Sequence, residues 1–278
     1  MKKTFWGGRR YCSLDYMLKK RYSEKLYKLS LNGGMTCPNR DGKISEGGCI
    51  FCSAGGSGDF AANFNPDIAK QIEQAKTLVS KKYQGDRFIA YFQAYTNTYA
   101  PVEYLCKLFM DTIMRDDIAI LSIATRPDCL GDDVIELLAE LNRIKPVWVE
   151  LGLQTINEST ARLINRGYEL SCYDEAVRRL RNIGVEIITH MIIGLPYETK
   201  EDILSTAEYI GKTANGIKLQ LMHILKNTKL LEMYEKGEFK ALTEEEYIEI
   251  VCEIISILPR EMVIHLSLIH ISEPTRPY

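Results

Sequence analysis

The chain has 278 residues, of which 46% are hydrophobic and 26% are charged, and its formal net charge is −2 at pH 7. This balance is typical of a globular protein with one large domain or two small ones. The amino terminus has no apolar run after its charged residues, and no stretch of about 18 apolar residues occurs, so we expect neither a signal peptide nor a membrane-spanning helix. Eight cysteines in such a chain favour metal chemistry in a reducing cytoplasm over disulfide bonds.

The first 30 residues are strongly basic, with nine lysines and arginines against two acidic residues, and six aromatic residues alternate with them. A segment of this kind can follow a phosphate backbone and stack on unpaired bases. It can equally be a solvated terminal segment whose aromatic side chains pack on the rest of the fold. We treat residues 1–24 as a basic amino-terminal extension and keep both interpretations open.

Short apolar runs alternate with amphipathic stretches along the rest of the chain. The apolar runs predict six strands, over Tyr27–Leu31, Arg87–Ala94, Ile118–Ala124, Val147–Gly152, Glu186–Ile193 and Gly216–His223. The stretches between them predict helices over Pro66–Lys82, Pro101–Arg115, Asp132–Arg143, Ser159–Asn165, Tyr173–Asn182 and Lys200–Thr213. Beyond these units we expect a helical carboxy-terminal segment at residues 227–265.

Capping residues mark the ends of several predicted helices. Thr199, followed three residues later by Asp202, predicts a capping box, and Ser171 with Asp174 predicts another. Gly184 follows a predicted helix at the position where a left-handed residue is favoured.

The last 13 residues, 266–278, differ in character from the rest of the chain. They resemble the translation of a transposase-type sequencing adapter, so we expect residues 266–278 to be an adapter-derived artefact and the natural protein to continue beyond His265. Residues 262–265 have the pattern of the beginning of a strand.

Six strand–helix units in series predict an α/β protein with a parallel sheet and right-handed crossovers. The strands are apolar on both faces, as buried parallel strands are. Periodicity does not separate a barrel from an open doubly wound sheet, but in either fold the functional site lies at the carboxyl ends of the strands.

Cys37, Cys49 and Cys52 form a C-x11-C-x2-C loop directly after the first predicted strand, with glycines on both sides. A structural zinc ion and a fully ligated iron–sulfur cluster each take four protein ligands, so three thiolates leave one ligand missing. A zinc ribbon needs a second cysteine pair, which the sequence lacks. The pattern therefore predicts a metal site at Cys37, Cys49 and Cys52 that holds a 4Fe-4S cluster with one open iron.

The sequence here resembles the radical S-adenosylmethionine (SAM) superfamily, whose cluster motif has an aromatic residue before the last cysteine, as Phe51 is here. The long spacer between Cys37 and Cys49 is similar to that of the branch containing the elongator catalytic subunit. Within this branch it resembles a bacterial family that carries the sequence found at residues 91–101. The resemblance implies a partial (β/α)6 TIM-type barrel of the radical SAM type, with its core at residues 25–226.

The same resemblance implies that several residues at the strand ends surround SAM. The methionine amino group would be held around Gln93 and Thr96, and the ribose by Glu150 or Gln154. Arg166 would bind the carboxylate or a ribose hydroxyl, and Gly194 would lie against the adenine. We therefore expect these cofactor-binding residues: Phe51, Gln93, Thr96, Glu150, Gln154, Arg166 and Gly194. His190 and His223 are candidates for substrate contact or proton transfer, or they are buried structural histidines.

The resemblance implies an enzyme whose open iron chelates SAM and whose reduced cluster cleaves it to methionine and a 5′-deoxyadenosyl radical. The branch acts largely on tRNA, and the bacterial family resembles enzymes that process the carbon-5 side chain of the wobble uridine. The resemblance therefore implies tRNA as the substrate and modification of that side chain. Two alternatives stay open: a radical SAM enzyme acting on a small metabolite, and a non-catalytic iron–sulfur or zinc protein that binds nucleic acid. A reductant such as flavodoxin or ferredoxin would be a further partner, and the oligomeric state is left open.

Overall fold

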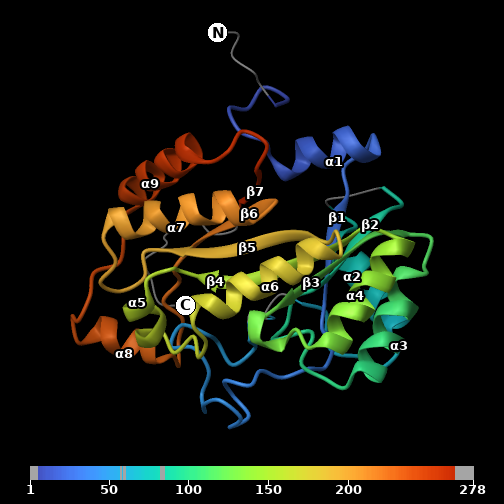
Figure 1. The fold of residues 1–278 in the computed structure, drawn as a ribbon, viewed down its shortest axis with the longest axis horizontal. Helices are drawn as coiled ribbons and strands as arrows, with labels where there is room; N and C mark the ends of the chain where they lie inside the picture. The colour runs from blue at the N-terminus through green and yellow to red at the C-terminus, as the bar shows by residue number, and fades with distance from the viewer. Residues whose placement is uncertain (1–5, 57, 59–60, 82–84, 267–278) are drawn as a thin grey trace.

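The protein is built on one sheet of seven parallel strands, which run in chain order from β1 to β7 (Figure 1). The computed structural model describes residues 6–56, 58, 61–81 and 85–266. Its strands are β1 Tyr27–Leu31, β2 Phe88–Phe92, β3 Ile118–Thr125, β4 Val147–Gln154, β5 Glu186–Ile193, β6 Gly216–Leu221 and β7 Val263–Leu266. The six predicted strands and the strand expected to begin at residues 262–265 are confirmed. Residues 267–278 of the expected artefact lie outside the described residues.

The sheet curls into a partial barrel, which decides between the two arrangements that periodicity left open. Lys28 on β1 pairs with Glu150 on β4, and Lys218 on β6 lies 3.0 Å from the hydroxyl of Tyr91 on β2. Side chains on strands this far apart in the sheet meet only if the sheet curves around them. Within the described residues, β1 and β7 are the two edges and do not pair with each other.

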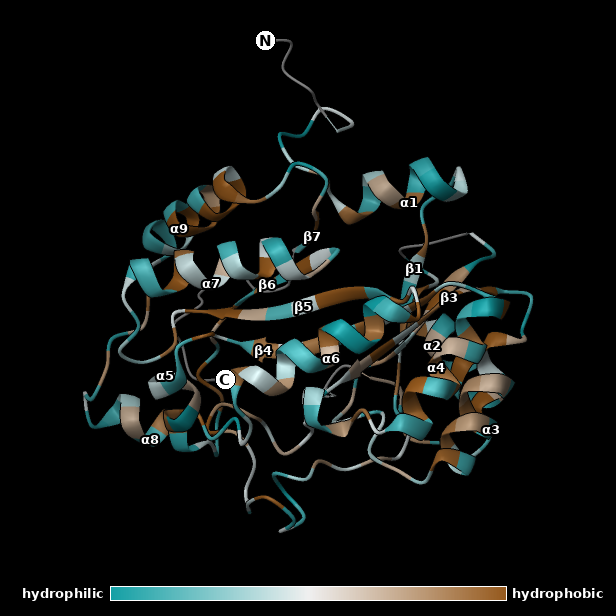
Figure 2. Cartoon of the chain, viewed as in Figure 1, coloured by the Kyte–Doolittle hydropathy of each residue, from teal (hydrophilic) through white to brown (hydrophobic). Residues whose placement is uncertain are grey.

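Nine α-helices are described, and most of them cover the outside of the curled sheet (Figure 1). They are α1 Leu14–Tyr22, α2 Ile68–Val79, α3 Val102–Ile113, α4 Asp132–Ile144, α5 Glu158–Leu163, α6 Leu170–Asn182, α7 Lys200–Thr213, α8 Lys229–Glu235 and α9 Glu244–Ile257, with a short 3-10 helix at Pro127–Cys129. Figure 2 shows hydrophobic residues along β5 and on one side of helices such as α3 and α4, with hydrophilic residues on the other side. No described helix is both long enough and apolar enough to cross a membrane.

An apolar layer fills the amino-terminal end of the barrel. It consists of Leu26, Ile89, Ile120, Trp148 and Ile188, which are all buried, together with Ala119 and Leu18 of α1. The sequence did not predict α1, which lies within the expected extension at residues 1–24. Ser13 forms a bridge with Ile264 of β7, so this part of the extension packs on the barrel. The cavity of the barrel is therefore closed at this end, and the carboxyl ends of the strands remain for a site.

The predicted helix ends agree with the structure at two positions and differ at two. Gly184 has a φ of +71° after α6, and Thr199 forms a capping box with Asp202. The cap at Ser171 is wrong, because Glu169 is the N-cap of α6 and Ser171 lies in its first turn. Asn165 is not helical, because its φ of +57° lies in the left-handed region and α5 has already ended. Lys82, the predicted end of another helix, lies outside the described residues.

The Thr199 cap gives a first test of the fold. Thr199→Ala removes the hydroxyl that accepts the Asp202 amide, so we expect the free energy of unfolding to fall by about 1 kcal/mol. Ser205→Ala, at an exposed position of the same helix, is the control and should change it by less than about 0.5 kcal/mol. Urea unfolding of both variants measures the difference, and equal stabilities would contradict the capping role.

Candidate functional site

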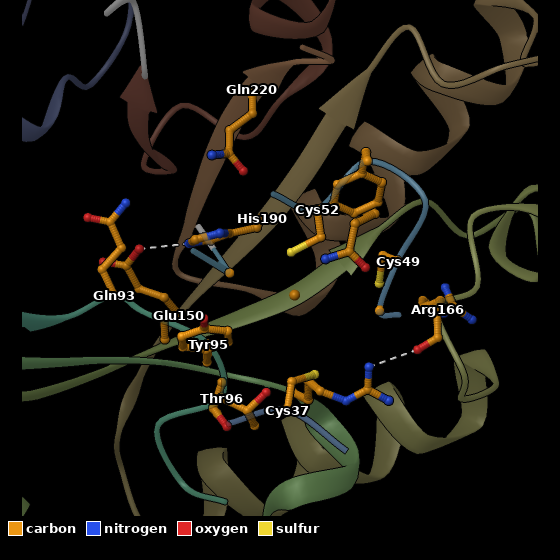
Figure 3. Close-up of a pocket in the computed structure, with 18 of the residues that line it drawn as sticks. Cys37, Cys49, Cys52, Gln93, Tyr95, Thr96, Glu150, Arg166, His190 and Gln220 are labelled. Carbon is orange, nitrogen blue, oxygen red and sulfur yellow. Dashed lines mark hydrogen bonds and ion pairs between the residues drawn. The ribbon is translucent and has the colours of Figure 1, made fainter. Parts of the chain in front are cut away.

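A cavity of about 150 Å³ opens at the carboxyl ends of the strands (Figure 3). Ten of the twelve predicted site residues line it: Cys37, Cys49, Phe51, Cys52, Gln93, Thr96, Glu150, Gln154, Arg166 and His190. Gly194 and His223 are not among the lining residues. At Gly194, which has a φ of +91°, an added Cβ would lie 2.9 Å from the side chain of Leu242. The structure thus brings together residues from the cysteine loop, from the region of three strands (β2, β4 and β5) and from the segment after α5, which are up to about 150 positions apart in the sequence.

The cysteine loop is held in place by two asparagines that the sequence analysis did not single out. The Asn39 side-chain amide donates to the carbonyls of Asn165 at 2.6 Å and Arg166 at 3.1 Å, and lies 3.7 Å from the sulfur of Cys49. Asn165 in turn donates to the carbonyl of Gly48 at 2.9 Å. The loop is therefore fixed to the segment that follows α5. An asparagine two residues after a cysteine is a weak signal, because only the fold shows its partner 126 residues away.

Two glycines allow side chains to approach the cysteines closely. An added Cβ at Gly48 would lie 2.9 Å from the guanidinium of Arg40, which donates to the carbonyls of Cys52 and Ser53. An added Cβ at Gly56, whose φ is +57°, would lie 2.2 Å from the ring of Tyr95. Glycine is needed at both positions because any side chain there would displace Arg40 or Tyr95.

The three cysteines are the kind of donor set that an iron–sulfur cluster takes. Their side chains line a single cavity. Burial, with Cys52 nearby, raises the pKa of the Cys49 thiol to about 12. A thiolate at Cys49 therefore needs positive charge beside it, which iron supplies. A cluster held by Cys37, Cys49 and Cys52 meets that need.

Arg166 is a structural residue of the cavity wall. Its side chain is buried and donates to the carbonyls of Thr155 at 2.7 Å and Tyr168 at 2.9 Å, and it pairs with Glu158 at 3.0 Å. These bonds occupy much of the guanidinium and fix the turn between β4 and α6. Gln154 has a φ of +65° at the end of β4, so the strand turns there and places this residue at the cavity.

Glu150 lies deeper, in a layer of polar side chains inside the barrel. Its carboxylate is fully buried and accepts hydrogen bonds from Ser122 at 2.7 Å and His190 at 2.7 Å. It also pairs with Lys28 and, at 3.4 Å, with Lys218. Burial alone would raise the pKa of Glu150, but the two lysines and His190 hold it well below the usual value. Its carboxylate is thus ionised and already surrounded by donors.

His190 is neutral at pH 7. Burial, with Lys218 nearby, lowers its pKa to about 4 despite the hydrogen bond to Glu150. Because the partner of Nε2 is a carboxylate, Nε2 carries the ring proton and Nδ1 is an acceptor. His190 is one of the residues that line the cavity.

The family is decided by comparison with known proteins. Residues 37–210 match the Radical SAM superfamily, and residues 214–273 match the Radical_SAM C-terminal domain. The chain belongs to the radical SAM superfamily. The recognition made from the cysteine loop and the strand ends is confirmed, and the superfamily match begins at Cys37.

Three known proteins show what this radical SAM protein is similar to. It is 46% identical to YtqA of Bacillus subtilis over 92% of this chain and 80% of YtqA. It is 29% identical to the tRNA uridine(34) acetyltransferase of Methanocaldococcus infernus over 50% of this chain and 26% of that protein. The structure of Elp3 from the same archaeon matches with a TM-score of 0.63 at 20% identity, covering 86% of this chain and 55% of Elp3, and shares the fold.

The radical SAM protein is therefore an enzyme that uses a 4Fe-4S cluster and SAM, as the superfamily does. The predicted enzyme class, both cofactors and the partial-barrel fold are confirmed. The individual roles of the predicted site residues remain proposals.

Proposed function

We propose that this enzyme uses its cluster and SAM to modify the carbon-5 side chain of the wobble uridine in tRNA. The observation that carries the proposal is the similarity of half of the chain to a tRNA uridine(34) acetyltransferase. The basic amino-terminal extension and its aromatic residues give secondary support. We place the enzyme in the reducing cytoplasm, which its eight free cysteines support.

In this proposal Cys37, Cys49 and Cys52 hold the cluster and Phe51 packs beside it. When bound, the cluster supplies the electron that splits SAM into methionine and a 5′-deoxyadenosyl radical, and a reductant such as flavodoxin or ferredoxin renews that electron. The wall formed by Gln93, Thr96, Gln154 and Arg166 positions SAM and excludes water. The neutral ring of His190 offers an acceptor to the substrate at Nδ1.

The roles predicted for three residues change in this proposal. Glu150 contributes to the site mainly by orienting His190 and balancing the lysines, because its carboxylate already has four partners. Gly194 does not line the cavity, and its lack of a side chain leaves room for the side chain of Leu242. His223 also lies outside the cavity lining.

Nucleoside profiling of tRNA from a strain lacking the gene tests the substrate. We expect one modified wobble uridine to disappear and its precursor to accumulate, because no other step would consume that precursor. Restoring the wild-type gene should recover the profile, whereas a Cys52→Ala gene should not. An unchanged profile would contradict the tRNA proposal and favour a small-metabolite substrate for the same chemistry.

A further inference from the structure

The polar layer inside the barrel carries an excess of positive charge. Lys28 and Lys218 face the single carboxylate of Glu150. The other titratable side chains of the layer are neutral, because burial holds the pKa of each histidine low and that of the tyrosine high: His190, His265 and Tyr91. Two cations and one anion leave one positive charge without a counter-charge in this layer.

The ammonium groups of Lys28 and Lys218 make cation–π contacts with the ring of one tyrosine, Tyr91. Lys28 and Lys218 are 4.3 Å and 4.9 Å from the centre of the Tyr91 ring. Lys218 also lies 3.0 Å from the Tyr91 hydroxyl and 3.4 Å from Glu150, the longest of the contacts that the carboxylate makes. Each ammonium group has three N–H donors, so Lys218 has donor capacity beyond these two contacts.

Both lysines face a second cavity, of about 530 Å³, at the open side of the barrel between β1 and β7. This lateral cavity also has Arg9 and Lys25 in its lining, from the amino-terminal segment. The cavity of about 150 Å³ at the carboxyl ends of the strands is here called the cofactor cavity. The two cavities meet at four residues that line both of them: Tyr91, Gln93, Lys218 and Gln220. A ligand in the lateral cavity therefore reaches the lysines and lies beside the place of SAM.

We propose that Lys28 and Lys218 form a subsite that binds an anionic group of the substrate, a carboxylate or a phosphate. A buried charge without a counter-charge is costly, and an anion beside the two ammonium groups would remove that cost. The apolar layer closes the amino-terminal end of the barrel below the two lysines. The anionic group would therefore be at the end of a substituent that extends from the rest of the substrate. This inference rests on the proposed function only in taking the ligand to be the substrate on which SAM acts.

The electrostatics of Lys218 provide a direct measurement. Burial, partly offset by Glu150 and reinforced by Lys28, lowers its pKa to about 8. Tyr91, His190 and His265 also face it from three other strands. A bound anion would raise this pKa by about one unit, which makes the reactive neutral amine about tenfold rarer near pH 7.

Trace reductive methylation of the anaerobically reconstituted enzyme, read by peptide mass spectrometry, tests the subsite. With ionic strength held constant by chloride, acetate or inorganic phosphate should slow the methylation of Lys218 about tenfold. Lys107, exposed on α3, is the control in the same sample and should react at an unchanged rate. Protection by acetate alone would identify a carboxylate, and protection by phosphate alone a phosphate.

Two outcomes would overturn the subsite. One is an unchanged rate at Lys218 with either anion. The other is full protection by SAM alone, with no further effect of either anion, because the lysines would then serve the cofactor. The labelling needs neither tRNA nor a reductant. An unchanged tRNA profile in the deletion strain would therefore refute the tRNA proposal and leave the anion subsite standing.

Discussion

Replacing Cys52 by alanine is expected to abolish the release of 5′-deoxyadenosine from SAM. Among the described residues, the cysteines that line the cofactor cavity are Cys37, Cys49 and Cys52, so Cys52→Ala removes one of the three thiolates proposed to hold the cluster. Losing a hydrogen-bonding partner of a metal ligand already costs about 10- to 100-fold in activity or metal affinity. Losing the ligand itself should cost more than that.

The measurement uses anaerobically reconstituted protein with dithionite and SAM. The variant should bind little iron, lack the brown colour of the wild type and release less than about one per cent of its 5′-deoxyadenosine. Cys252→Ala is the control, because Cys252 is exposed on α9 and does not line the cofactor cavity. A Cys52→Ala variant that releases as much product as the wild type would show that the cluster does not depend on this thiol.

The sheet could be predicted from the sequence because each strand carries its own signal. The predicted bounds of β1 and β5 are those of the structure, and β3 is buried along its whole length, as an apolar run predicts. The closure of the barrel could not be predicted in this way. It depends on contacts between strands that are not neighbours, such as Lys28 with Glu150, 122 residues apart.

Helix α1 was missed for a different reason. Its charged residues dominate the composition of the segment, and Leu18 alone is fully buried among its apolar residues. Ser13 does accept the amide of Tyr16 as an N-cap, so a local helix signal was present. The segment was interpreted from its charge, so this helix signal was overlooked.

The residues of the site also differ in whether a local sequence signal indicates them. Cysteines at close spacing predict a metal centre, since chemistry and sequence position agree. The positions of Asn39, Arg40 and Lys218 in the site depend on backbone geometry and on distant partners, so no local pattern indicates them. The strand-end residues were named from the resemblance to the radical SAM superfamily, and the rule that the carboxyl ends of parallel strands meet at one edge supports only their general location.

The second large effect is expected at the buried carboxylate. Glu150→Gln keeps the size of the side chain but leaves Lys28 and Lys218 without their counter-charge. Removing one partner of a buried ion pair costs about 3–5 kcal/mol, so we expect a loss of that size in the free energy of unfolding near pH 7. Glu186→Gln is the matched control, because Glu186 pairs with Arg21 at a partly exposed position, where such pairs contribute up to about 1 kcal/mol.

The pH dependence separates charge from shape at this position. The pKa of Glu150 is held below its usual value, so its contribution to stability is present above about pH 4.5 and is lost as the pH falls towards the native pKa. Burial already lowers the pKa of Lys218, and in Glu150→Gln this lysine loses its proton more readily, so the stability difference from the wild type should shrink as the pH rises towards about 9. Urea unfolding at several pH values measures this difference. A deficit that stays constant from acid to alkaline pH would mean that packing, and not charge, holds Glu150 in the barrel.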